Sequence, residues 1–504
     1  MLLINPPIVK PCEPPAGLAY LAGALHAHSL PYTVLDANIE GILHIAGLPA
    51  ISGDTWTRRA GRHVQRNLNA LRDRRTFGNV DRYKRAVIDV NRILQVNTET
   101  GGFRVTLSNF QDSFRSPLRS ADLMESFREF EKNPFFSYFQ ERFQPLLERI
   151  RPSMVGFSLN YLSQALCTFA MMGFLRHLHP RVKILLGGGL VNSWMKSPAW
   201  SDPFREIVDH CIAGPGEAPL FGILGKEPPV RSSAPRYDDF PISSYLSPGF
   251  ILPYSASRGC YWQQCSFCPE RAEGNSFEPV PPSRVISDLR RLSEKTAPAL
   301  IHLLDNSIPP TLLNMLADTH PGAPWFGFAR ISNIPIDLEF CRSLKRSGCV
   351  MLKLGVESGS QEVLDAMNKG IDLRKASVVL RNLSGAGIAT YVYLLFGTPP
   401  ESISEARETL AFTERHGDVI DFLNLAVFNL PAYGPDADVL HSDDFYEGDL
   451  TLYRRFSHPR GWDRPLVRKF LDTEFKNHPA VAKILRRDPP FFSSNHAPFI
   501  KRTD

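Results

Sequence analysis

The chain lacks several features that would place it in common classes of protein. It has only 8 cysteines in 504 residues, far fewer than a disulfide-stapled domain carries, and this low density suits a reducing compartment. No run of about 18 apolar residues is present, so we expect no membrane-spanning helix. A basic segment followed by an apolar core and a small-residue cleavage site is also missing, so we expect a cytoplasmic protein without a signal peptide.

Motifs of familiar enzyme and binding classes are absent as well. The chain has no metalloprotease motif, no nucleophile elbow and no phosphate-binding P-loop. It has no Gly-x-Gly-x-x-Gly, so nicotinamide or flavin binding is not indicated. The net charge of +5 is modest, and the arginine-rich residues 58–85 include only Phe77 and Tyr83 as aromatic stacking partners. Nucleic acid is therefore not an expected partner.

The first 225 residues alternate short apolar runs with helical patterns, which is typical of a parallel sheet wound with helices. The predicted strands are residues 2–5, 32–36, 154–158, 183–187 and 207–213. A helical insertion is predicted at residues 42–145. Glycine turns, Gly187-Gly188-Gly189 and Gly214-Pro215-Gly216, end two of the strands, where an open α/β sheet places its ligand crevice. We therefore predict a Rossmann-like, flavodoxin-like domain with a bound cofactor.

The rest of the chain predicts a linker, a barrel and an extension. Residues 226–250 are rich in proline and lack periodicity, which indicates a linker. Beyond them, apolar runs at residues 300–304, 325–329, 351–356, 390–396 and 422–428 alternate with helical patterns. These βα units predict a partial or complete (β/α) barrel over residues 251–430, with its chemistry at the C-terminal strand ends. Residues 431–504 form an extension, either a substrate cap over the barrel mouth or a packed end.

The motif that carries chemistry is a loop with three cysteines, Cys260, Cys265 and Cys268. Three thiolates this close can bind one inorganic cluster, and a [4Fe-4S] cube with three protein ligands leaves one iron open. Zinc with a fourth ligand is an alternative, although no Cys or His stands at a matching zinc-finger offset downstream. A disulfide with one cysteine left over is another. The spacing favours the iron–sulfur cluster.

The cysteine loop and the βα units resemble the radical SAM superfamily across residues 250–430. In this resemblance the three cysteines match the cluster ligands, although the usual Cys-x3-Cys-x2-Cys has one residue fewer in its first gap. Phe267 matches an aromatic position near the adenine of S-adenosylmethionine (SAM). The resemblance implies further SAM-binding residues at the strand ends, namely Asp305, Asn306, Arg330, Glu357, Ser358 and Gly397.

The N-terminal region resembles the cobalamin-binding domain of cobalamin-dependent radical SAM enzymes. The segments that carry this resemblance are residues 5–7, 14–22, 155–158, 187–189 and 214–217. The Asp-x-His-x-x-Gly motif is absent, so the resemblance implies cobalamin without an axial imidazole from that motif. The cobalamin-binding residues that it implies are Pro7, Gly17, Ser158, Gly188, Gly189, Gly214, Gly216 and Glu217.

Together the two resemblances imply an enzyme that reductively cleaves SAM to a 5′-deoxyadenosyl radical and methylates an unactivated carbon with the help of cobalamin. Radical cyclisation or rearrangement without methyl transfer is one alternative, and a non-catalytic cobalamin sensor is another. A small-molecule, lipid or peptide substrate is expected, as is an electron donor such as flavodoxin or ferredoxin. No catalytic side chain is assigned by the sequence.

Overall fold

The computed structural model describes residues 1–50, 54–99, 101–227, 233–434, 437, 439–444, 448–490 and 496–500. These residues form two compact units. The first unit holds Met1–Gly249 and residues 448–452, and the second holds residues 250–444 and 453–500. Part of the predicted linker, residues 228–232, lies outside the described residues.

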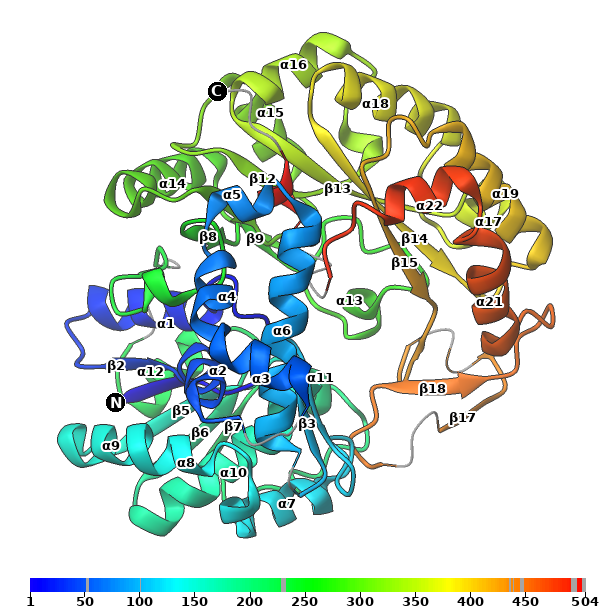
Figure 1. Cartoon of the computed structure of the whole chain (residues 1–504). Helices are drawn as coiled ribbons and strands as arrows, with labels where there is room; N and C mark the ends of the chain where they lie inside the picture. The colour runs from blue at the N-terminus through cyan, green and yellow to red at the C-terminus, as the bar shows by residue number, and fades with distance from the viewer. Residues whose placement is uncertain are drawn as a thin grey trace. The chain divides into compact units, whose positions relative to one another are not determined.

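The first unit is built on a five-stranded parallel sheet in the order β2-β1-β5-β6-β7 (Figure 1). Its strands are β1 (Leu2–Asn5), β2 (Thr33–Asp36), β5 (Met154–Ser158), β6 (Lys183–Gly187) and β7 (His210–Ile212). This is the flavodoxin order, so the predicted fold class of this unit is confirmed. The order reverses between β1 and β5, and open α/β sheets bind ligands at such a switch point.

Five helices connect or flank these strands, namely α1 (Ala16–Ala27), α2 (Ala37–Gly47), α10 (Leu162–Leu178), α11 (Gly189–Met195) and α12 (Glu217–Ile223). The strands are buried apolar runs, as the sequence pattern predicts for a parallel sheet. The last strand is shorter than the predicted residues 207–213. It begins only at His210, because the Ile184 N–H of β6 donates to the Asp209 carboxylate at 2.8 Å and not to a backbone carbonyl of β7.

Between α2 and β5 the chain forms further helices and a hairpin. These elements are α3 (Thr55–Arg62), α4 (Val64–Ala70), α5 (Arg74–Phe77), α6 (Val80–Thr98), β3 (Phe103–Val105), β4 (Phe110–Asp112), α7 (Ser120–Arg128), α8 (Phe136–Tyr138) and α9 (Gln144–Ile150). β3 and β4 pair antiparallel. The region is anchored by buried apolar side chains on α6, whose opposite face is polar and exposed.

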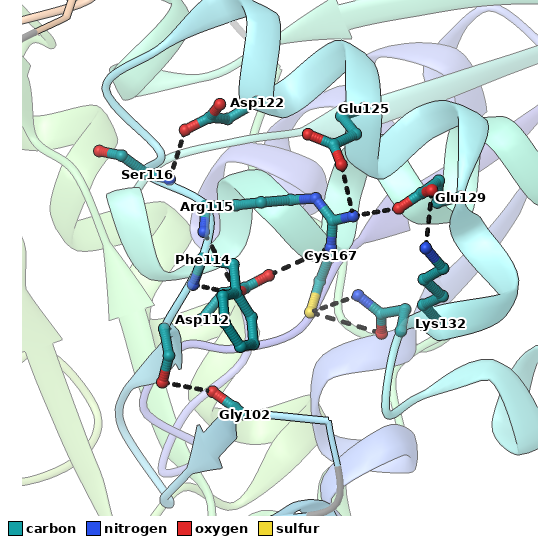
Figure 2. A network of polar contacts seen from close by, with 12 residues as sticks. Gly102, Asp112, Phe114, Arg115, Ser116, Asp122, Glu125, Glu129, Lys132 and Cys167 are labelled. Atoms are coloured by element: carbon teal, nitrogen blue, oxygen red, sulfur yellow. Dashed lines mark hydrogen bonds and ion pairs between the residues drawn. The ribbon is translucent and has the colours of Figure 1, made fainter.

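A single arginine joins the β3–β4 hairpin to α7 (Figure 2). The Arg115 guanidinium pairs with Asp112 at 3.4 Å, with Glu125 at 3.0 Å and with Glu129. Lys132 binds Glu129 from the other side at 2.7 Å. Charge pairing therefore fixes the hairpin beside α7.

The second unit contains a six-stranded sheet, parallel throughout, in the order β15-β14-β13-β12-β11-β8. The strands are β8 (Ile251–Tyr254), β11 (Leu300–Leu303), β12 (Trp325–Ala329), β13 (Cys349–Glu357), β14 (Ala389–Phe396) and β15 (Phe422–Val427). Neighbours in the sheet follow the chain order, and β8 and β15 are its two edges, so the barrel is partial. The five predicted apolar runs coincide with β11 to β15, except that residues 304 and 428 lie just beyond the ends of their strands.

Helices follow the strands on the outer side of this sheet, as Figure 1 shows for the green to yellow part of the chain. They are α14 (Pro282–Thr296), α15 (Pro310–Asp318), α16 (Leu338–Arg346), α17 (Gln361–Ala366), α18 (Leu373–Gly385) and α19 (Ile403–Arg415). Each crossover helix returns the chain to the start of the next strand. All the C-terminal strand ends therefore lie at one edge of the sheet.

The C-terminal extension packs against the second unit at both ends of the strands. It holds an antiparallel sheet of β16 (Leu430–Pro431), β18 (Tyr453–Phe456) and β17 (Ser442–Asp444), then α21 (Arg464–Phe470) and α22 (Pro479–Leu485). Val467 lies against Gly397 at the end of β14. Ala497 instead belongs to the apolar cluster of Ile251 and Phe326, at the beginnings of the strands. The last described residues thus fill the base of the barrel and not its mouth.

Among the described residues, no helix combines the length and the apolar character that crossing a bilayer requires.

Candidate active site

The cysteine loop follows the first strand of the second sheet. It lies between β9 (Ser257–Arg258) and α13 (Pro269–Ala272) and carries three free cysteines. Cys265 is buried, whereas Cys260 and Cys268 are partly exposed. Burial raises the pKa of the Cys268 thiol, and the neighbouring Cys265 and Cys260 sulfurs raise it further. The Cys260 and Cys265 sulfur atoms therefore both lie near that of Cys268.

The loop is docked on a turn formed by residues 367–370, which we call the docking turn. Three successive backbone carbonyls of this turn accept hydrogen bonds, two from the cysteine loop and one from Arg330. The pairs are Ser266 N with Met367 at 3.0 Å, Trp262 Nε1 with Asn368 at 3.0 Å, and Arg330 Nη2 with Lys369.

The shape of the docking turn depends on two residues with a left-handed backbone. Asn368 has φ +52° and Gly370 has φ +65°. A Cβ on Gly370 would lie 2.4 Å from the Trp262 ring. Glycine is therefore required at Gly370 by both the backbone and the close ring.

Arg330 follows β12 and lies beside Cys265 of the cysteine loop. Its Nη1 is 3.9 Å from the Cys265 sulfur, and its guanidinium carbon lies 4.2 Å from the centre of the Trp262 ring. The side chain is buried, and its Nε has no hydrogen-bond partner among the described residues. Because a buried orphan donor is costly, this atom marks a place where a further polar ligand would fit.

Asp305 and Asn306 follow β11 and hold the cysteine loop from the side of the sheet. Asp305 accepts hydrogen bonds from the Ser257 hydroxyl and from Ala256 N, the latter at 3.2 Å. Burial raises the pKa of Asp305 to about 6. Asn306 donates to the Gly259 carbonyl at 3.3 Å. In the structure these two side chains, which the sequence predicts to bind SAM, contact the segment that leads into the cysteine loop.

Glu357 ends β13 and forms an ion pair with a residue of the docking turn. Its Oε1 is 2.7 Å from Lys369 Nζ, and both side chains are largely buried. Lys369 Nζ also lies 5.5 Å from the centre of the Phe267 ring. A Cβ on Gly355 would be 2.4 Å from Glu357 Oε1, so the Glu357–Lys369 ion pair lies directly against this glycine. Phe267, Glu357 and the cysteine loop are thus brought together.

Ser358 and Gly397 lie at the ends of β13 and β14 and are engaged within the protein. The Ser358 hydroxyl is fully buried, 3.3 Å from that of Thr409, and it accepts the Ser360 N–H. Gly397 has φ +77°, and its N–H donates to the Glu401 carboxylate. In the described part these contacts give Ser358 a role in shaping the strand end.

The C-terminal extension holds the turn after Gly397, a contact that no local motif predicts. Trp462 Nε1 donates to Glu401 Oε2 at 2.9 Å, and His458 Nε2 lies 2.9 Å from the Thr398 carbonyl. Glu401 is fully buried, and burial raises its pKa to about 7. The turn at the end of β14 therefore depends on residues more than fifty positions away.

In the first unit, the predicted cobalamin-binding residues lie at the C-terminal ends of the strands. Gly188 has φ +112°, and a Cβ there would lie 2.4 Å from the Leu159 carbonyl oxygen. Gly189 N donates to Asn160 Oδ1 at 3.0 Å, and Asn160 Nδ2 donates to the Ser158 hydroxyl at 3.0 Å. Packing within the protein therefore explains Gly188 without a ligand.

Gly214 and Gly17 behave differently, because a Cβ on either would meet nothing within 4 Å. Gly214 has φ +70° and donates its N–H to Asn192 Oδ1 at 2.9 Å. Gly216 lies close to Leu21, with 3.3 Å from its Cβ position to a leucine methyl. Pro7 and Glu217 are buried at the same edge of the sheet.

The donor set fits an iron–sulfur cluster. In the part of the chain that the structure describes, no three His, Cys, Asp or Glu side chains gather around a single ion position. A cube differs from a single ion, because each thiolate binds a different iron and the sulfurs stand around the cluster. The three cysteines next to the buried Arg330 guanidinium, whose Nε has no hydrogen-bond partner among the described residues, are compatible with that arrangement.

Comparison with known proteins agrees with this geometry. The Radical SAM superfamily matches residues 254–413. An uncharacterised methyltransferase of Pyrococcus horikoshii is 24% identical over 241 residues, 42% of this chain and 50% of that protein. The bacteriochlorophyllide d C-12(1)-methyltransferase of Chlorobaculum tepidum is 27% identical over 197 residues, 36% of this chain and 42% of that protein. The matches thus span half or less of these curated relatives.

Solved structures resemble the chain over a greater length. The radical SAM methyltransferase TsrM from Kitasatospora setae, with tryptophan and a SAM analogue bound, has a TM-score of 0.56 at 15% identity. The match covers 97% of this chain and 89% of TsrM. The cobalamin-dependent radical SAM enzyme OxsB with aqua-cobalamin has a TM-score of 0.51 at 15% identity, over 68% of this chain and 63% of OxsB. The chain therefore contains a radical SAM domain, within a fold that matches cobalamin-dependent radical SAM enzymes over most of its length.

Proposed function

We propose that this chain is a cobalamin-dependent radical SAM enzyme that methylates an unactivated carbon of its substrate. The observation that carries the proposal is the cysteine loop on its docking turn, with Arg330, Lys369 and Glu357 gathered around it. When bound, a [4Fe-4S] cluster and SAM supply a 5′-deoxyadenosyl radical, which reaches carbon centres that acid–base side chains cannot.

In this proposal the chain's own residues hold and orient both groups. Cys260, Cys265 and Cys268 hold the cluster. The SAM-binding residues remain Phe267, Asp305, Asn306, Arg330, Glu357, Ser358 and Gly397. Asp305 and Asn306 act through the loop that they support, because their side chains bind Ser257, Ala256 and Gly259. Lys369 is added to the set, since it pairs with Glu357 and lies over Phe267.

The first unit is proposed to bind cobalamin at the C-terminal ends of its strands. Gly214 and Gly17 support this, because each leaves room beside the backbone at that edge. The proposed set is completed by Pro7, Ser158, Gly188, Gly189, Gly216 and Glu217. Methyl transfer is supported by the names of the two curated methyltransferases. A third curated relative, the anaerobic magnesium-protoporphyrin IX monomethyl ester cyclase of Cereibacter sphaeroides, is 25% identical over 169 residues and supports cyclisation without methyl transfer as the second candidate.

The test is anaerobic reconstitution of the full chain with iron, sulfide and a corrinoid. We expect about one cluster per chain, a retained corrinoid, and transfer of an isotope-labelled methyl group from SAM to a product. Replacing the three loop cysteines with alanine should abolish SAM cleavage, whereas the matched control Cys211→Ala should keep it. A chain that cleaves SAM but neither retains nor needs the corrinoid would rule out this route to methylation. Cysteine variants with function intact would favour a cobalamin sensor.

A further inference from the structure

Arg330 is a buried cation with neutral partners. It is 7% exposed, and its nitrogen atoms contact a thiol, a backbone carbonyl and no carboxylate within the described residues. The Trp262 ring covers one face of the guanidinium at 4.2 Å. A buried charge without a counter-charge costs several kcal/mol. The arrangement therefore calls for an anion beside Arg330.

The Cys265 sulfur is the atom that can supply this anion. Its distance of 3.9 Å from Nη1 is within the range of a weak N–H···S contact. A cysteine that binds iron does so as a thiolate, which carries the negative charge that the guanidinium lacks. Arg330 is held at this sulfur from two other sides, by the Trp262 ring and by the Lys369 carbonyl.

We propose that Arg330 is a positioning residue that sets the reduction potential of the cluster through the Cys265 sulfur. The inference rests on the proposed function, because it assumes that the three cysteines hold a cluster. Reduction adds one electron to an already anionic group. A fixed positive charge and an N–H···S contact favour that electron, so they raise the potential. Trp262 contributes by fixing the plane of the guanidinium.

The experiment is a potentiometric titration of the reconstituted full chain without SAM, followed by electron paramagnetic resonance. Arg330→Gln removes the charge, Arg330→Lys keeps it without the planar contact, and Trp262→Leu removes the aromatic face. Arg464→Gln is the matched control, since Arg464 is a partly buried arginine of the same unit that binds the Phe428 carbonyl and Asn429. Iron and sulfide content is measured for each variant.

Arg330→Gln should make cluster reduction about tenfold less favourable, which equals about 59 mV toward negative potential for one electron. Arg330→Lys and Trp262→Leu should shift it in the same direction by less, and Arg464→Gln should not shift it. An unchanged SAM-free potential in Arg330→Gln, with only weaker SAM binding, would overturn the inference and leave Arg330 with its proposed SAM-binding role alone.

Cluster loading separates this inference from the proposed function. A wild-type chain that never forms a cluster would contradict the proposed function itself. If Arg330→Gln folds but binds no iron, the reduction potential is measured in Arg330→Lys instead. Failure of Arg330→Lys to hold iron would also contradict the inference, because it assigns the guanidinium to tuning the cluster and not to assembling it.

Discussion

The two parallel sheets differ in what they present at the ends of their strands. Two strands of the first sheet end in glycine turns, at Gly188 and Gly214, that are held by asparagine side chains. The second sheet ends in charged and sulfur groups, among them Arg330, Lys369 and the cysteine loop. The glycine turns of the first sheet are therefore held by neutral amide contacts, whereas the strand ends of the second sheet are held by charged groups.

Among the variants that test this difference between the sheets, the largest loss of stability should come from removing one partner of the buried ion pair in the second sheet. Lys369→Met leaves the Glu357 carboxylate buried and unpaired, which should lower the free energy of unfolding of the second unit by about 3–5 kcal/mol. Denaturant unfolding of the chain without cofactors measures it. Adding Glu357→Gln should recover most of the loss. A cost of the single variant below about 1 kcal/mol would show that the pair is solvated.

Two glycines of the first sheet test whether a glycine is required by packing within the protein or by the close approach of a ligand. Gly188→Ala brings a Cβ to 2.4 Å from a carbonyl oxygen and strains a backbone with φ +112°, so we expect a loss of about 3 kcal/mol or more. In Gly214→Ala the new Cβ meets open space, so only the left-handed backbone at φ +70° is unfavourable. We expect this variant to lose about 1–2 kcal/mol of unfolding free energy. Thermal unfolding ranks the two. Corrinoid retention should suffer more in Gly214→Ala, and the opposite ranking would contradict its role.

The turn after β14 should make stability depend on pH. Glu401 in the folded chain keeps its proton up to about pH 7, whereas its ordinary pKa is 4.5. A raised folded pKa means stability that is complete below about pH 4.5 and is lost as pH rises through 7. The free energy of unfolding of the wild type should therefore fall relative to Glu401→Gln, by up to roughly 1.4 kcal/mol per pH unit in that interval. Parallel pH profiles for both proteins would contradict the burial of a neutral Glu401.

The smallest effect is expected away from both strand edges, at the arginine of the hairpin. Arg115→Gln removes three charge contacts that lie partly in solvent, so about 1–2 kcal/mol should be lost. The matched control Arg142→Gln breaks one exposed contact of 3.7 Å with Glu40 and should cost almost nothing. Urea unfolding monitored by fluorescence compares them. Equal costs would show that the hairpin does not depend on Arg115.

Much of the fold could be predicted because each strand is a short apolar run with a clear end. β5 and β6 begin and end at the predicted residues, and five strands of the second sheet, β11 to β15, follow the predicted runs, whereas β8 (Ile251–Tyr254) was not predicted. The cysteine spacing likewise identified the loop from neighbouring residues alone. β7 was predicted too long, because a side-chain carboxylate of Asp209 replaces a backbone partner there.

The contacts that complete the site could not be predicted, because they join distant parts of the chain. Arg330 and Cys265 are 65 residues apart, and Trp262 and Asn368 are 106 apart. Trp262 and the Lys369-Gly370 pair can be read in the sequence, but neither indicates the residue that it contacts. Ala497 at the base of the barrel carries no local signal, since its apolar surroundings come from six different strands.

Reduction of the anaerobically reconstituted chain, with and without SAM, tests the central claim most directly. Electron paramagnetic resonance should show a reduced [4Fe-4S] signal that changes when SAM is added, with 5′-deoxyadenosine released in the same sample. Tetrahedral zinc bound by Cys260, Cys265 and Cys268, or a cluster whose signal ignores SAM and yields no 5′-deoxyadenosine, would contradict it.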